Sequence, residues 1–253
     1  MADSNNINLL NKTFDVIELL AAAGHEMGVS EISRSLSMVK SGTFRILNTL
    51  KERDLIYQNP ANKCYGLGLK LYFIGSAAQA GLPLCTVAKK YLDALSLTFE
   101  ERFELCIPYT QGAGIPSCMA VSEGSTFSSL HGTQKPIRPM HATSAGKCLL
   151  SFASDSEVKS YKGYELEKFT EKTVTCWEEL DVQMQKIRDL GFCECDGEFT
   201  PHIKGLAVPV YDSMHSLLGA LSVSGNDMHI NKLDMTELVK ALQRAARNIG
   251  KNF

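Results

Sequence analysis

The sequence contains no long apolar run: nowhere do about 18 consecutive apolar residues, the length of a membrane span, occur. Its first residues, MADSNNINLL, lack the basic start and apolar core of a signal peptide. We therefore expect a cytoplasmic protein with no membrane partner. In that reducing compartment the eight cysteines are expected to be free thiols or metal ligands rather than a disulfide framework.

Motifs typical of catalytic sites are also missing. The sequence has no G-x-x-x-x-G-K-[ST], G-x-S-x-G, H-E-x-x-H or complete G-x-G-x-x-G. We therefore expect no catalytic residue and no cofactor, and a small-molecule enzyme is the least favoured class. Thiol catalysis through Cys193 or Cys195 has no local signature to support it.

An excess of charge of one sign is lacking as well. The 253 residues carry 26 Lys and Arg against 28 Asp and Glu, a formal net charge of −2. This balance argues against indiscriminate nucleic-acid binding but leaves a local patch open. Residues 1–70 carry eight bases and seven acids, and the bases gather between Arg34 and Lys63.

Residues 1–70 show the order of a winged helix-turn-helix, which is three helices followed by a hairpin. A first helix ends near Gly24, Ser30 is the candidate N-cap of a short second helix, and a third spans 39–53. Residues 55–58 and 63–67 are expected to form strands around an Asn/Pro turn. The expected inner face of the first helix consists of Leu10, Phe14, Ile17 and Ala21.

The third helix has two different faces. The apolar face, expected to be buried, consists of Val39, Thr43, Ile46, Leu47 and Leu50. The outward face carries Lys40, Ser41, Phe44, Arg45, Asn48 and Lys51. Cations, a hydroxyl, an aromatic ring and an amide are the groups that contact phosphates and base edges in a major groove. An ordinary solvated face is the alternative; the order of elements favours DNA. Asn59, Asn62 and Lys63 are weaker candidates in the wing.

The rest of the chain predicts an α+β domain, an antiparallel sheet covered by helices. Strand-like runs lie at 103–109, 115–121, 127–131, 192–195, 205–211 and 217–224. Helical patterns lie at 84–97, 142–152, 177–190 and 232–249. Residues 69–81 are expected to form a helix that connects the two halves of the chain. We expect a DNA-binding domain over 1–70, a linker helix over 71–81 and a ligand-binding, oligomerising domain over 82–253.

Two segments predict a ligand pocket. Strand alternation puts Leu218, Ala220, Ser222 and Ser224 on one face, with Leu217, Leu221 and Val223 on the other. Small residues also open a helix at 141–147, where free backbone N–H groups suit a carboxylate or phosphate. Together they suggest a pocket for a small organic acid.

Cys193 and Cys195 share one face of a strand, with Asp196 beside them. Zinc sites usually have four ligands, and His131 or His141 would have to come from elsewhere in the chain. A zinc- or thiol-based sensor therefore stays open as an alternative.

The chain resembles the IclR family of bacterial transcriptional regulators along nearly its whole length. The stretch 40–50, KSGTFRILNTL, is similar to the family's recognition helix, and Tyr65-Gly66-Leu67-Gly68 to the end of its wing. The most specific match is KPIRPMHATSAGKCLL over 135–150. Gly191-Phe192, Gly197-Glu198, Ala207-Val208-Pro209-Val210 and Ser222-Val223-Ser224-Gly225 follow in the family's order.

The resemblance implies a winged-helix domain, a linker helix and a GAF-like effector domain. It also implies dimers or tetramers on palindromic operators, a small-molecule effector, and a repressor more often than an activator. Its DNA-binding positions include Gly42, where the family commonly has a hydroxyl residue. The effector positions that it implies are Phe127, Leu130, Ser144, Ala145, Cys195, Asp196, Gly205, Ser222 and Ser224. Cys195 stands where some members have Asp, which keeps thiol or metal sensing open.

Overall fold

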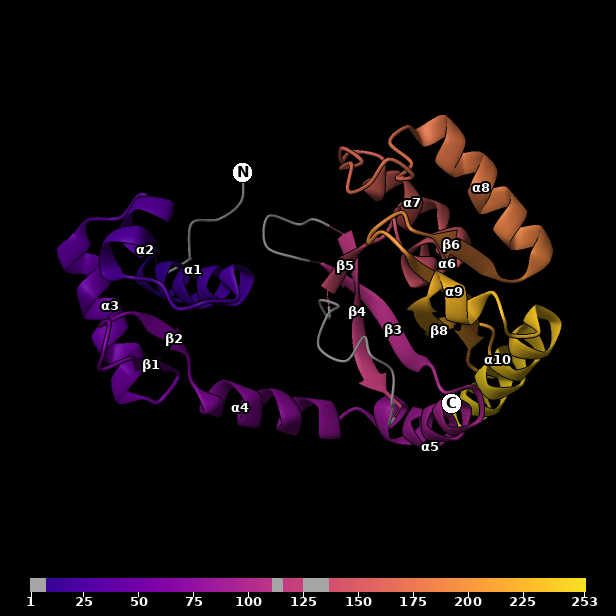
Figure 1. The fold of residues 1–253 in the computed structure, drawn as a ribbon, viewed down its shortest axis with the longest axis horizontal. Helices are drawn as coiled ribbons and strands as arrows, with labels where there is room; N and C mark the ends of the chain where they lie inside the picture. The colour runs from indigo at the N-terminus through magenta and orange to yellow at the C-terminus, as the bar shows by residue number, and fades with distance from the viewer. Residues whose placement is uncertain (1–7, 111–115, 125–136) are drawn as a thin grey trace. The chain divides into compact units, whose positions relative to one another are not determined.

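A computed structural model describes residues 8–110, 116–124 and 137–253 (Figure 1). The chain divides into two compact units, Met1–Gly81 and Leu82–Phe253. The expected strand at 127–131, and the candidate site residues Phe127 and Leu130, lie outside the described residues.

The first unit is a winged helix-turn-helix, as predicted. Its elements are α1 (Asn8–Ala23), α2 (Val29–Ser35), α3 (Lys40–Glu52), β1 (Ile56–Gln58), β2 (Tyr65–Leu67) and α4 (Leu69–Ala80). The strands pair antiparallel, with Tyr57 opposite Gly66. Its core consists of Val16, Leu20, Met27, Ile32, Ile46, Leu47, Leu50, Ile56 and Tyr65.

Three details of the first unit differ from the prediction. The buried residues of α1 are Val16 and Leu20, while Leu10 and Phe14 are exposed. Apolar residues lie on several sides of this helix, so spacing alone did not select the buried stripe. Val39 is 77 % exposed, because it precedes α3 as an extended N-cap and the helical wheel does not apply to it. The N-cap of α2 is Gly28, not Ser30.

The second unit is built on a six-stranded antiparallel sheet of order β5-β4-β3-β8-β7-β6. The strands are β3 (Arg102–Thr110), β4 (Pro116–Glu123), β5 (Ile137–Pro139), β6 (Cys193–Asp196), β7 (Ile203–Tyr211) and β8 (Leu217–Asn226). The helices are α5 (Pro83–Phe99), α6 (Ser144–Phe152), α7 (Asp155–Tyr161), α8 (Trp177–Leu190), α9 (Asp227–Ile230) and α10 (Met235–Gly250). Short β5, α7 and α9 had no counterpart in the sequence prediction.

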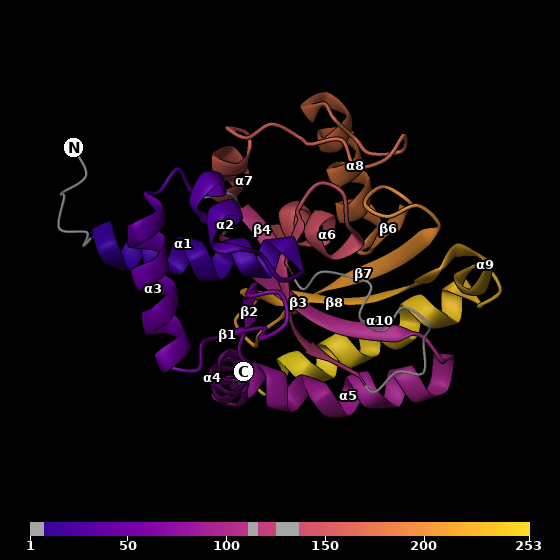
Figure 2. The same ribbon diagram turned by 60° about the vertical axis from the view of Figure 1, so that its left-hand side comes forward.

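Helices cover both faces of this sheet (Figure 2). On one face α5 and α10 pack on Phe103, Leu105, Leu221 and Val223. On the other face α6 and α8 pack on a second core that includes Cys106, Ala207 and Ala220. The predicted antiparallel sheet covered by helices is confirmed.

The alternation of β8 holds at one end of the strand and fails at the other. Leu221 and Val223 enter the core under α5 and α10. Leu218 joins that core and Leu217 joins the opposite one, which reverses the prediction for these two leucines. The cause is a register shift, since Tyr211 pairs with Leu217 while Val210 pairs with Gly219.

Within the described residues, no single helix has the length and apolar composition to cross a membrane. In the described part of the chain, one bent pair of helices, α4 with α5, passes such a test. One face of α5 is in the core of the second unit.

Candidate DNA-binding surface and ligand pocket

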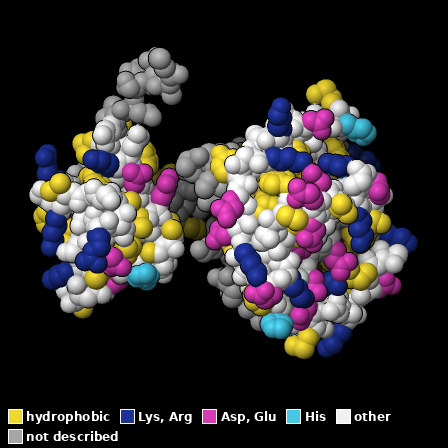
Figure 3. Space-filling view, turned by 90° about the horizontal axis from the view of Figure 1, so that it is seen from above, with side chains coloured by type: hydrophobic (Ala, Val, Ile, Leu, Met, Phe, Trp, Pro, Cys, Tyr) yellow, Lys and Arg dark blue, Asp and Glu magenta, His cyan; other side chains and the backbone are white. Residues whose placement is uncertain are grey.

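The start of α3 presents the residues expected to contact DNA. Lys40, Ser41, Gly42 and Arg45 are exposed, Phe44 is 48 % exposed, and Asn48 is half-buried. Val39 makes no side-chain cap, so the first N–H groups of α3 are open to an anion such as a phosphate. In the view of Figure 3, Lys and Arg side chains lie along the left-hand edge of this unit.

Gly42 has open space around it. A Cβ built on this residue would meet no atom within 4 Å. The fold of the first unit therefore does not require glycine here, and the missing side chain leaves room on the outer side of the helix.

The wing is fastened by Glu26, which lies between α1 and α2. Its carboxylate accepts hydrogen bonds from Tyr57 Oη at 2.9 Å, from Asn59 Nδ2 at 2.8 Å and from Asn62 Nδ2 at 2.9 Å. These hydrogen bonds, that from Asn62 foremost, lower the pKa of Glu26. The side-chain amides of Asn59 and Asn62, which were expected to face DNA, thus donate to Glu26. Lys63 is exposed and takes a φ of 60° in the turn.

A pocket lies between the start of α6, the strands β7 and β8, and the loop after β6. Its lining residues are Arg138, Ala142, Thr143, Ser144, Ala145, Cys195, Glu198, Phe199, Thr200, Ile203, Gly205, Ser222 and Ser224. Of the predicted effector positions, Ser144, Ala145, Cys195, Gly205, Ser222 and Ser224 meet here. Asp196 does not line it: its carboxylate is exposed and lies 3.2 Å from Lys172 Nζ. Alternation along β6 turns Asp196 away from the face of Cys195.

The first turn of α6 offers free N–H groups to the pocket. Thr143 is the N-cap, and its Oγ1 accepts from Gly146 N at 3.1 Å. The first intrahelical bond runs from Lys147 N to Thr143 O, so the N–H groups of Ser144 and Ala145 precede it. This turn lies close to β7, because a Cβ on Gly205 would come 2.7 Å from Ser144 Oγ.

Two serines of β8 face the same space. Ser224 is 8 % exposed, and its Oγ has no hydrogen-bond partner among the residues that the structure describes. Ser222 Oγ has a weak contact with Cys106 Sγ at 3.9 Å. Buried hydroxyls usually have partners, so an unsatisfied one in a pocket wall indicates a place for a polar ligand atom.

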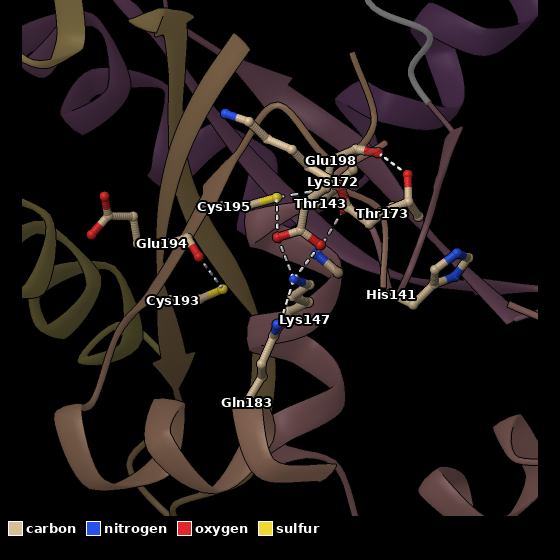
Figure 4. A network of polar contacts seen from close by, with 12 residues as sticks. His141, Thr143, Lys147, Lys172, Thr173, Gln183, Cys193, Glu194, Cys195 and Glu198 are labelled. Atoms are coloured by element: carbon tan, nitrogen blue, oxygen red, sulfur yellow. Dashed lines mark hydrogen bonds and ion pairs between the residues drawn. The ribbon is translucent and has the colours of Figure 1, made fainter. Parts of the chain in front are cut away.

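One wall of the pocket contains a buried ion pair (Figure 4). Lys147 is 1 % exposed, and its Nζ lies 2.5 Å from the carboxylate of Glu198 and 2.6 Å from Gln183 Oε1. Cys195 Sγ donates to Glu198 Oε1 at 3.4 Å. The pair ties α6 and α8 to the loop after β6.

The same loop is held from its other side. Thr170 Oγ1 donates to Gly197 O at 2.7 Å, and Thr173 Oγ1 donates to Glu198 O at 2.5 Å. Phe199 packs against Phe169 with ring centres 4.9 Å apart. These contacts fix the backbone that presents Glu198 and Phe199.

His141 supports this wall from behind rather than facing a ligand. Its Nε2 donates to the carbonyl of Glu167 at 2.9 Å, and its Nδ1 accepts from Tyr161 Oη at 2.8 Å. Its ring stacks on Phe169. Burial lowers the pKa of His141, so the neutral imidazole fits both bonds.

A charged cluster spans β3, β4 and β5, and its Arg138 lines the pocket. Arg138 donates two parallel bonds, of 2.7 and 2.8 Å, to Glu104. Arg102 Nη2 lies 2.7 Å from Glu104 and 2.8 Å from Glu123. Arg138, Arg102 and Glu104 are all buried.

The two cysteines of β6 are buried thiols. Burial raises the pKa of Cys193 and of Cys195 well above the ordinary value, which favours the neutral thiol over the reactive thiolate. Cys193 belongs to the core under α6, and only Cys195 of the two lines the pocket. The described part of the chain has no group of three or more His, Cys, Asp or Glu arranged to hold a metal ion. The zinc- or thiol-sensing alternative gains no support from this geometry.

Comparisons with known proteins give the family. Residues 77–251 match the family model of the bacterial transcriptional regulator IclR C-terminal region, and residues 9–60 match the IclR helix-turn-helix domain. The chain belongs to the IclR family. IclR-family membership carries with it regulation of transcription through a helix-turn-helix and an effector-binding second domain, and the predicted family is confirmed.

Curated relatives of this IclR-family chain are transcriptional regulators. The HTH-type transcriptional regulator KdgR of Escherichia coli is 28 % identical over 249 residues, which are 97 % of this chain and 92 % of the relative. The HTH-type transcriptional repressor AllR of Escherichia coli is 24 % identical over 241 residues, 95 % and 88 % of the two chains.

Solved structures share the fold. An IclR transcriptional regulator from Alicyclobacillus acidocaldarius aligns with a TM-score of 0.80 at 20 % identity, over 97 % of this chain and 98 % of that one. An IclR homologue from Microbacterium hydrocarbonoxydans, complexed with 4-hydroxybenzoate, aligns with a TM-score of 0.78 at 19 % identity, over 96 % and 98 %.

Sequence reasoning missed two charged residues of the pocket and one that holds the wing of the first unit. Arg138 and Glu198 stand inside the stretches that matched the family, but single charges near apolar positions did not mark them as pocket residues. Glu26 had no local signal, because its three partners lie more than 30 residues away.

Proposed function

We propose that this IclR-family regulator binds operator DNA through the start of α3 and is controlled by a small acid bound in the α6/β8 pocket. The DNA contacts would come from Lys40, Ser41, Phe44 and Arg45, with Asn48 and Lys63 at the margins and the bare backbone of Gly42 close to the DNA. Their joint exposure on one face of α3 carries this part of the proposal. Like AllR, it would act as a repressor in the cytoplasm, by ligand binding rather than catalysis.

A duplex selected from a random pool for binding to the wild-type chain tests the DNA-binding face. We expect Lys40→Ala with Arg45→Ala to weaken binding of this duplex by a few kcal/mol, at ~1–3 for each lost contact. The control is Lys159→Ala with Lys186→Ala, which removes the same charge from exposed positions of the second unit. Equal losses in the two double variants would refute the assignment to α3.

The unsatisfied hydroxyl of Ser224, beside the free N–H groups of α6, supports an acidic ligand. A carboxylate would accept from the N–H groups of Ser144 and Ala145, and Ser222 and Ser224 would bind a second polar atom. Ala145, Cys195 and Gly205 would shape the wall. A homologue's complex with 4-hydroxybenzoate shows that an IclR structure accepts an aromatic acid.

The pocket has a volume of about 40 Å³, which suits a few water molecules, since one water needs about 10–15 Å³ of such space. An organic acid therefore needs the wall to move. Thr200 is the exposed lining residue and Phe199 is half-buried, so we expect this part of the wall to yield first. A ligand that prefers the opened arrangement shifts the equilibrium between two states of the regulator.

We also propose that the chain works as a dimer, which could pair further into a tetramer. No residue of α4 is buried, yet it carries Leu69, Tyr72, Phe73 and Ile74, all exposed. Contiguous apolar side chains of this size are typical of an interaction surface. We expect Tyr72→Glu with Phe73→Glu to yield monomers in sedimentation velocity. A wild-type chain that sediments as a monomer would refute the dimer.

A further inference from the structure

A row of polar positions crosses three neighbouring strands on the pocket face. Gly205 in β7 pairs with Ser224 in β8, and Ser224 pairs with Arg102 in β3. Directly paired residues project to the same face of a sheet, so Arg102 lies beside Ser224. Ser144, at the first turn of α6, lies over Gly205. The row therefore leads from the N-terminus of α6, past Ser224, to Arg102.

Arg102 is a buried cation with unused donors. Its side chain is only 8 % exposed, and Nη2 is the atom that serves Glu104 and Glu123. Its Nε and Nη1 are buried and have no hydrogen-bond partner among the described residues, which is also true of Ser224 Oγ. Unsatisfied buried donors are costly and rare in proteins. Two neighbouring side chains of one row thus lack an acceptor.

The local charge favours an anion as that acceptor. Arg102 and Arg138 share the carboxylate of Glu104, which is 1 % exposed. Glu123 also contacts Arg102, but its side chain is 44 % exposed, so water screens it. The buried part of this cluster holds two cations and one carboxylate.

We propose that the effector is a short dicarboxylate that bridges the row. This proposal rests on the proposed function and specifies the chemical class of its effector. One carboxylate accepts from the N–H groups of Ser144 and Ala145, the other accepts from Nε and Nη1 of Arg102, and the hydroxyl of Ser224 bonds between them. Two strand spacings separate Gly205 from Arg102 by roughly 10 Å. An acid that reaches from the N–H groups of α6, over Gly205, to the guanidinium of Arg102 therefore needs a carboxylate at each end of a short chain, as in succinate or glutarate.

Calorimetry of the full chain with matched acids tests this inference. Succinate and glutarate are compared with butyrate and valerate, which have the same chain lengths and one carboxylate fewer. We expect each dicarboxylate to bind about ten- to a hundredfold more tightly than its partner, the scale of a charge-assisted hydrogen bond. Arg102→Gln should remove this preference by weakening the binding of the dicarboxylates.

Two further variants separate ligand binding from a merely structural role. Arg102→Lys keeps a cation for Glu104 but lacks the guanidinium donors, so it should lose most of the preference without loss of thermal stability. Lys172→Gln removes a cation that pairs with Asp196 outside the pocket and should keep the full preference.

Several results would overturn the inference. Equal binding of succinate and butyrate, or no binding of any of the four acids at millimolar concentration, contradicts a dicarboxylate effector. A preference that survives Arg102→Gln contradicts the role of Arg102. None of these results touches the proposed function, which fails separately if the wild-type chain selects no DNA sequence, or if Ser224→Ala leaves the affinity for every acid that binds unchanged.

Discussion

Breaking the buried pair of Lys147 and Glu198 should destabilise the second unit strongly. Lys147→Met leaves the Glu198 carboxylate, 11 % exposed, without its cation. Losing one partner of a buried ion pair costs about 3–5 kcal/mol, a large part of the ~5–15 kcal/mol that stabilises a typical protein. Replacing both partners by apolar residues of similar volume is often close to neutral. We therefore expect Lys147→Met/Glu198→Leu to be more stable than Lys147→Met alone.

The assay is urea unfolding followed by the fluorescence of Trp177. The chain has one tryptophan, and it opens α8, the helix that supplies Gln183 to Lys147. Lys168→Met is the matched control, because its pair with Glu171 is exposed and such pairs contribute about 0–1 kcal/mol. Equal effects of Lys147→Met and Lys168→Met, with additive costs in the double variant, would refute the role given to the buried pair.

Three further predictions concern other parts of the chain. Burial raises the pKa of Glu101 to about 7, so the folded state holds this proton more tightly than the unfolded state. The free energy of unfolding therefore falls as pH rises from about 4.5 through 7, by at most about 3 kcal/mol. Urea unfolding at pH 5 and pH 8 should show that Glu101→Gln removes this loss. Glu26→Ala should release the wing and weaken operator binding measured by fluorescence anisotropy. If hydrogen exchange in β1 and β2 stayed unchanged in this variant, Glu26 would not be what holds the wing. Gly42→Ala should raise the free energy of unfolding of the first unit by up to about 1 kcal/mol and weaken operator binding. A lower free energy of unfolding would mean that the space around Gly42 is not open.

The sequence predicted elements well where periodicity is strong. The helix expected at 177–190 is α8 with the same bounds, and the strands around Ser222 and Ser224 lie where alternation put them. The sequence-based prediction was wrong where the local pattern of residues did not determine which side chains are buried. The stripe of α1 was ambiguous, and the register shift opposite Leu217 depends on how two strands pair.

The candidate site was predictable in its backbone and less so in its charges. Small residues at the start of α6 and the hydroxyls of β8 are local signals, and the fold brings them together. The partners of Lys147 and Arg138 lie 51 and 34 residues away along the chain. Such pairings arise only from strand order and helix packing, so no spacing in the sequence announces them.

In the proposed function, the start of α3 holds the regulator on its operator. The salt dependence of operator affinity tests it most directly, since each lost phosphate contact lowers the slope of log K against log salt by about 1. For Lys40→Ala with Arg45→Ala we predict weaker binding and a slope smaller by up to about 2, with no change in Lys159→Ala/Lys186→Ala. An unaltered affinity and slope in the α3 double variant would mean that Lys40 and Arg45 do not hold the regulator on DNA.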